Sequence, residues 1–88
     1  MNQILLLQEL ETLAAQLGVE LRYEELETSG GLCRYSGKLC LIVDRRLPLA
    51  RRIALLSREL GRLPLEGVFL RPSVRELLEK QVRKITES

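Results

Sequence analysis

The sequence predicts an α+β domain, in which one helix precedes a three-stranded antiparallel or mixed sheet and two further helices follow. Apolar residues recur every three or four positions near both ends of the chain, which is typical of amphipathic helices. Between them, a short stretch alternates apolar and charged residues, and glycines separate it from two more apolar runs. With 88 residues, we expect a single domain spanning 1–88.

The first helix is expected over residues 3–17, where leucines recur at helical spacing. These leucines are Leu6, Leu10, Leu13 and Leu17. Gly18 follows at the position where a left-handed residue commonly ends a helix. Residues 19–24 alternate strictly between apolar and charged side chains, which indicates a half-buried strand.

Two more strands are expected over residues 32–35 and 39–43, joined by a short hairpin connection at residues 36–38. Residues 25–31, which end in two glycines, are expected to form the preceding loop. All five positions of the 39–43 strand are apolar. Such a strand is normally covered on both faces, by helices, by another sheet or by a second subunit.

A second helix is expected to begin around Pro48, which suits a first helical turn, and to stop near Gly61 and Pro64. Its apolar stripe consists of Leu49, Ile53, Leu56, Leu60 and Leu63. A connector over residues 65–71 follows, and its apolar residues 68–70 are expected to tuck onto the core.

The last helix is expected to start with a capping box, in which Ser73 precedes Glu76 by three residues. Its apolar stripe consists of Val74, Leu77, Leu78, Val82 and Ile85.

Composition excludes several kinds of chemistry. The chain has no histidine, which excludes His-based catalysis, the usual His-ligated zinc sites and haem held by His, but not Cys, Asp or Glu chemistry. The net charge of +2 is too small to indicate nucleic-acid binding by itself. No basic residue precedes Arg22, and no apolar run approaches the ~20 residues that span a bilayer. We therefore expect a cytoplasmic protein without a membrane segment.

The most informative segment is Ser57-Arg58-Glu59-Leu60-Gly61-Arg62, within the helix that follows the strands. Over residues 3–63 the order of elements resembles that of the ImmA/IrrE-like zinc metallopeptidases, whose active-site helix bears His-Glu-Leu-Gly-His. Glu59-Leu60-Gly61 matches the middle of that motif, while Arg58 and Arg62 stand where the family has its two zinc-binding histidines. The resemblance implies a minimal zincin-like fold that lacks the metal ligands.

Arginine stays protonated and offers no lone pair, so Arg58 and Arg62 would repel Zn²⁺. We therefore expect no metal, no cofactor and no enzymatic activity, and instead an interaction or regulatory domain whose partner is another protein or a second copy of the chain. A simpler interpretation places Arg51, Arg58 and Arg62 on a solvated helix face, with Glu59 and Arg52 at its boundary.

Four arginines around the start of the second helix form a candidate anion or partner patch: Arg45, Arg46, Arg51 and Arg52. Cations at a helix N-terminus oppose the helix dipole, and no aromatic residues are interleaved for base stacking. A nucleic-acid or anion-binding module is therefore an alternative function, with nucleic acid the less expected partner.

Two cysteines are the remaining candidate site. If the hairpin turns on Ser36-Gly37, Cys33 lies directly opposite Cys40, whereas a three-residue turn would place the two on opposite faces. Buried reduced thiols are the simpler interpretation for a cytoplasmic protein. A small thiol redox protein is the other alternative function.

Overall fold

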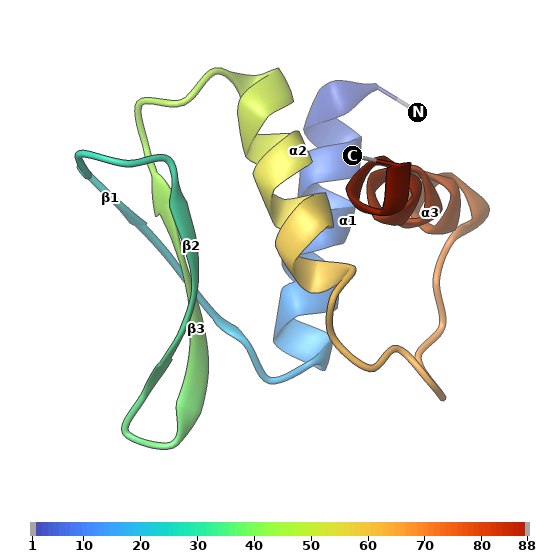
Figure 1. The fold of residues 1–88 in the computed structure, drawn as a ribbon, viewed down its shortest axis with the longest axis horizontal. Coiled ribbons are helices and arrows are strands. Elements are labelled where there is room, and N and C mark those ends of the chain that lie inside the picture. Colours follow the sequence, from blue (N-terminus) through green and yellow to red (C-terminus); the bar gives the residue numbers. More distant parts are fainter. Residues whose placement is uncertain (1, 88) are drawn as a thin grey trace.

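The computed structural model describes the backbone of residues 2–87 and the side chains of residues 2–81, and it has the predicted α+β layout (Figure 1). One helix precedes three strands, and two helices follow. In chain order the elements are α1 (Gln3–Gln16), β1 (Glu20–Glu24), β2 (Gly30–Tyr35), β3 (Lys38–Asp44), α2 (Leu49–Leu60) and α3 (Pro72–Glu87).

The three strands form a mixed sheet in the order β1-β3-β2. The central strand β3 pairs with β1 in parallel, with Tyr23 opposite Val43, and with β2 in antiparallel, with Cys33 opposite Cys40. Consequently β1 and β2, which are consecutive in the sequence, lie at the two edges of the sheet.

The β2–β3 hairpin closes with a two-residue turn. Ser36 and Gly37 have φ angles of 51° and 78° between the paired residues Tyr35 and Lys38. Positive φ at both central residues is the conformation that matches the twist of a tight hairpin. This confirms the first of the two predicted registers, in which the cysteines face each other.

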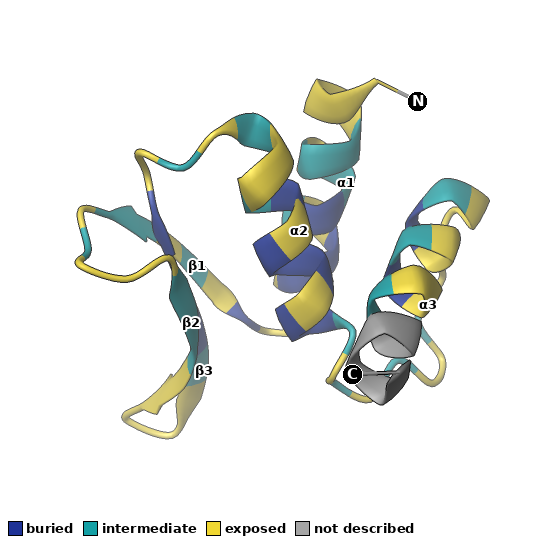
Figure 2. Ribbon diagram, turned by 45° about the horizontal axis from the view of Figure 1, so that its top comes forward, coloured by how far each residue is buried: buried dark blue, intermediate teal, exposed yellow. Residues whose placement is uncertain are grey.

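Helices cover one face of the sheet. In Figure 1, α1 and α2 lie beside the strands, and α3 packs on these two helices on the side away from the sheet. The core between the layers is made of aliphatic residues, and Figure 2 colours the buried residues of α1 and α2 dark blue. Its fully buried members include Leu10, Leu41, Val43, Leu56 and Leu60.

Local signals at the helix ends account for most of the boundaries. The Asn2 side chain accepts a hydrogen bond from the backbone N–H of Leu5 at 2.9 Å, which caps the start of α1. Gly18 follows the helix with φ of 73°, as predicted for a left-handed residue after a C-cap. The helix α2 begins one residue after Pro48, which forms its N-cap.

Three local predictions need correction. Gly30 and Gly31 belong to β2 and not to the preceding loop. At Gly30, which has φ of 122°, a Cβ would lie 2.0 Å from the Ile42 carbonyl oxygen, so the close approach of the two strands requires glycine here. Phe69 is 81% exposed, although its neighbours Val68 and Leu70 are half-buried as expected.

The helix α3 begins at Pro72, so Ser73 lies within its first turn and not at the predicted cap position. Proline suits this first position because its missing N–H has no partner there in any helix. The prediction that Val82 and Ile85 complete the apolar stripe falls on side chains outside the described residues.

The strand β3 is covered by helices on only one face within the described part of the chain. Leu41 and Val43 point into the core, and the strand alternation places Cys40 and Ile42 on the opposite face. Cys40 is nevertheless buried and Ile42 half-buried, because β3 is the central strand and its neighbours flank it on both sides.

Candidate functional site

The segment that resembles the metallopeptidase motif forms a compact group of three charges at the end of α2. Glu59 is 7% exposed, and each of its carboxylate oxygens faces one guanidinium group. Arg58 Nη2 lies 3.5 Å from Oε1 and Arg62 Nη1 lies 3.6 Å from Oε2. The two positions where the family has zinc ligands are therefore brought together, but as the two cations of an ion triad.

The surroundings of Glu59 explain how a carboxylate comes to be buried here. The helix places it beside the edge strand β2, and Oε1 lies 3.8 Å from where a Cβ on Gly31 would be. A larger residue at this position would occupy the space next to the carboxylate. The helical wheel places Glu59 at the boundary of the arginine face. In the structure its carboxylate forms ion pairs with two arginines, and it is buried more deeply than a boundary position requires.

The helix also ends before the motif does. The last residue of α2 is Leu60, and Arg62 lies in the following turn, where its N–H donates to the Glu59 carbonyl at 3.3 Å. In the family that the sequence resembles, one helix bears the whole motif. Among the described residues, no group of three Cys, Asp or Glu side chains is placed to hold a metal ion.

Three of the four arginines of the predicted anion patch brace the loops at one end of the sheet. The loop between β1 and β2 must pass the end of β3, and Arg45 and Arg46 hold it there. Arg45 Nη2 lies 2.9 Å from Glu25 Oε1, and Arg46 binds both the Asp44 carboxylate and the Leu26 carbonyl. Hydrogen bonding from Arg46 holds the pKa of Asp44 below its usual value.

Arg52 ties the beginning of α2 to the segment that joins β3 to α2. Its guanidinium donates to the carbonyls of Leu47, at 2.9 Å, and of Arg45. It also lies 5.6 Å from the centre of the Tyr23 ring, within the range of a cation–π contact. The three bracing residues therefore have structural contacts that compete with any external anion.

Arg51 differs from the other members of the patch. Together with Arg58 and Ser29 it lines a cleft of about 230 Å³ between α2, the loop that precedes β2, and α3. No hydrogen bond or ion pair of its guanidinium is found within residues 2–81. The predicted patch thus separates into three bracing arginines and one, Arg51, whose guanidinium has no partner within residues 2–81.

The two thiols meet on the sheet face opposite α1 and α2. Cys33 is exposed and Cys40 is buried, and both are free cysteines. Burial raises the pKa of the Cys40 thiol, and the neighbouring Cys33 and Glu20 raise it further. The structure therefore brings the predicted pair together with unequal access to solvent.

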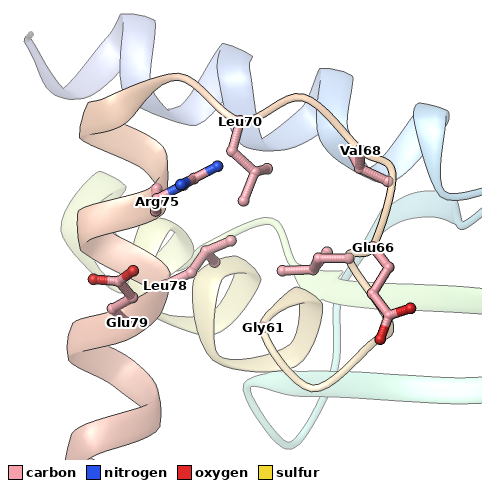
Figure 3. A pocket seen from close by; sticks show the side chains of 8 residues that line it. Gly61, Glu66, Val68, Leu70, Arg75, Leu78 and Glu79 are labelled. Atoms are coloured by element: carbon pink, nitrogen blue, oxygen red, sulfur yellow. The ribbon is translucent and has the colours of Figure 1, made fainter.

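A groove beside α3 was missed by the sequence reasoning. It has a volume of about 650 Å³ and lies between α3 and the loop that joins α2 to α3 (Figure 3). Its apolar lining comes from Leu65, Val68, Leu70 and Leu78. A signal was present in the sequence, since the connector over residues 65–71 has more apolar residues than a solvated loop needs.

Charged side chains flank this groove in a particular arrangement. The guanidinium of Arg75 is directed into it, between Leu70 and Leu78, while the carboxylates of Glu66 and Glu79 point outward (Figure 3). For the side chains that the structure describes, no ion pair or hydrogen bond engages the Arg75 guanidinium. The groove thus combines an apolar lining with one available positive charge.

Comparisons with protein-family models, with curated proteins and with solved structures give no significant match to this chain. Of the helices in the described part, none is both long and apolar enough to cross a membrane.

Proposed function

We propose that this chain is a non-catalytic cytoplasmic protein-interaction domain, a degenerate metallopeptidase-like scaffold that binds an apolar peptide segment carrying a carboxylate. The observation that carries the proposal is the groove beside α3, in which the Arg75 guanidinium faces an apolar lining without a partner among the described residues.

The ion pairs of Glu59 in the metallopeptidase-like segment support a role without catalysis. In the His-Glu-x-x-His arrangement, the glutamate activates a water molecule bound to zinc. Here the Glu59 carboxylate faces the guanidinium groups of Arg58 and Arg62, which cannot ligate a metal ion. With both oxygens paired in this way, the carboxylate is suited to holding the end of α2 in place.

The chemistry of the groove indicates its partner. A lining of leucine and valine favours apolar side chains, because their burial contributes roughly 25 cal/mol per Å². A guanidinium at the same place favours a carboxylate, to which it can donate two parallel hydrogen bonds. A peptide with apolar residues next to Asp or Glu satisfies both requirements, whereas a basic peptide would meet Arg75 with a like charge.

Selection from a random phage-displayed peptide library tests the proposal. We expect enrichment of peptides that combine apolar residues with an acid. Leu70→Asp should abolish the enrichment, and Arg75→Glu should shift it towards basic peptides. Arg34→Glu changes an exposed arginine on the hairpin that does not line the groove, and should leave the preference unchanged. Equal enrichment with wild type and Leu70→Asp would contradict the proposal.

A second candidate function is anion binding in the cleft beside Arg51, supported by a guanidinium that has no partner among the described side chains. Isothermal titration with inorganic phosphate tests it. Arg51→Gln should weaken binding at least tenfold, while Arg45→Gln should have little effect because its guanidinium is held by Glu25. Equal losses in the two variants would indicate general attraction by positive charge and not a site.

A further inference from the structure

The sheet face opposite the helices bears the two cysteines side by side. Leu41 and Val43 point into the core, so the alternation of β3 directs Cys40 outward, and Cys33 shares its face because the two are directly paired. On the other side of β3, Glu20 is the register partner of Cys40. Cys40 is only 3% exposed, whereas Cys33 is accessible.

The hairpin geometry sets the distance between the two backbones. Tyr35 and Lys38 close a two-residue turn, so Cys33 and Cys40, two positions further along each strand, form a hydrogen-bonded pair of the antiparallel ladder. Such pairs have Cα atoms about 5.5 Å apart, which lies within the range that disulfides span.

The Cβ atoms of such a pair are roughly 4.5–5.5 Å apart, somewhat wider than the roughly 3.5–4.5 Å of a relaxed disulfide. The strands must therefore draw together slightly when the bond closes. A bond formed under this strain is reduced more easily than a relaxed structural disulfide, so the geometry favours reversible oxidation.

We propose that Cys33 and Cys40 are a redox modification site, at which a low-molecular-weight disulfide converts the two thiols into an intrachain disulfide that thiols can reduce again. The exposed Cys33 reacts first, and the buried Cys40 completes the bond. This inference does not depend on the proposed peptide groove, since the cysteines lie on a different surface of the molecule.

The reaction balances in two exchange steps. The Cys33 thiol loses its proton, and the thiolate attacks one sulfur of the disulfide RSSR, forming Cys33–S–S–R and releasing RS⁻, which takes up the proton. The Cys40 thiolate then attacks the Cys33 sulfur, which forms the intrachain bond and displaces the second RS⁻. The two cysteines lose two electrons and two protons, and RSSR becomes two RSH.

The unequal environments of the two thiols make the second step the slower one. Burial, the adjacent Cys33 and the carboxylate of Glu20 raise the pKa of Cys40, while Arg22 opposes them. Only the thiolate attacks, so little Cys40 is reactive at neutral pH. We expect ring closure to accelerate as the pH rises from 7 to 9, while the mixed disulfide at Cys33 forms first.

Oxidised glutathione is the probe, and intact-mass spectrometry of acid-quenched samples of the full chain is the readout. Wild type should first gain one glutathione. Its final mass should be two hydrogens below that of the reduced protein, with two reduced glutathione molecules released. Cys40→Ala should stop at the adduct, and Cys33→Ser should remain at least tenfold less modified than Cys40→Ala. Dithiothreitol should return wild type to its reduced mass.

Three outcomes would overturn the proposal: a stable adduct on wild type without ring closure, equal modification of the two variants, or covalent dimers as the main product. If Cys40→Ala does not fold by circular dichroism, peptide mapping of the wild-type intermediate replaces it. Glutathione on Cys33 would support the proposal, and glutathione on Cys40 would contradict it.

Discussion

Replacement of Glu59 by glutamine tests whether Arg58, Glu59 and Arg62 form an ion triad that stabilises the fold. The substitution keeps the shape of the side chain and removes its charge. Arg58 and Arg62 then lose their common partner, although their side chains are 44% and 56% exposed and recover much of their hydration.

The expected loss follows from this geometry. Hydrogen bonds to charged groups contribute about 1.5–3 kcal/mol each when they are buried and well aligned, but exposed ion pairs contribute about 1 kcal/mol or less. At 3.5 and 3.6 Å, with a buried carboxylate and half-exposed cations, the two contacts lie between these limits. We expect Glu59→Gln to lower the free energy of unfolding by about 2 kcal/mol.

Urea unfolding followed by circular dichroism measures this difference. With a slope of about 1 kcal/mol per M for so small a domain, the midpoint should fall by about 2 M. Raising the salt concentration from 0.05 to 1 M should destabilise wild type more than the variant, because salt screens the ion pairs that only wild type has. Glu27→Gln is the control, since Glu27 is exposed and should tolerate the change. An unchanged or higher midpoint for Glu59→Gln would refute the structural role.

Further predictions concern the backbone, the acid stability and the exposed aromatic residue. Gly30→Ala should cost roughly 3 kcal/mol or more, because its Cβ would lie 2.0 Å from a backbone carbonyl, whereas Gly37→Ala, with open space around it, should cost about 1–2 kcal/mol in the same urea assay. The pKa of Asp44 is lowered in the folded state by Arg46, so its ion pair stabilises the fold above the unfolded pKa and is lost as the pH falls through the folded value. Thermal melts should therefore show that Asp44→Asn is less stable than wild type at pH 7 and loses less stability between pH 5 and pH 2. Phe69→Ser should leave the melting temperature within about 2 °C of wild type, because the ring is 81% exposed, and a larger drop would show that the ring packs in solution.

The elements themselves were predictable from the sequence because their signals are local. The leucines of α1 are three or four positions apart, about one helical turn, and Gly18 follows the helix directly. The alternation of β1 lies within one strand. The hairpin register was predictable as one of two alternatives, and the two-residue turn at Ser36-Gly37 decides between them. Its consequence, the pairing of Cys33 with Cys40, was therefore within reach of sequence reasoning.

The strand order and the burial of Glu59 could not be predicted, because both depend on contacts between residues that are distant in the sequence. Periodicity does not say that β1 pairs with β3 and not with its neighbour β2, because both pairings bury the same alternating face. The burial of Glu59 likewise involves β2, an element distant in the sequence, because its carboxylate lies beside Gly31 of that strand. In a helical wheel, Glu59 could only be placed at the edge of the charged face.

The strand order also explains why three arginines of the predicted anion patch bind groups within the fold. Because β3 lies between β1 and β2, the short loop over residues 25–29 must cross the end of β3, where the Ser29 carbonyl accepts a hydrogen bond from Asp44. Arg45 and Arg46 bind a carboxylate and a carbonyl of this loop, and Arg52 binds carbonyls of the adjoining segment between β3 and α2. A cluster of like charges along a sequence therefore does not by itself indicate an anion site. In this chain, Arg51 and Arg75 are better candidates for binding, because their guanidinium groups line a cleft or a groove and have no partner in the described part of the structure.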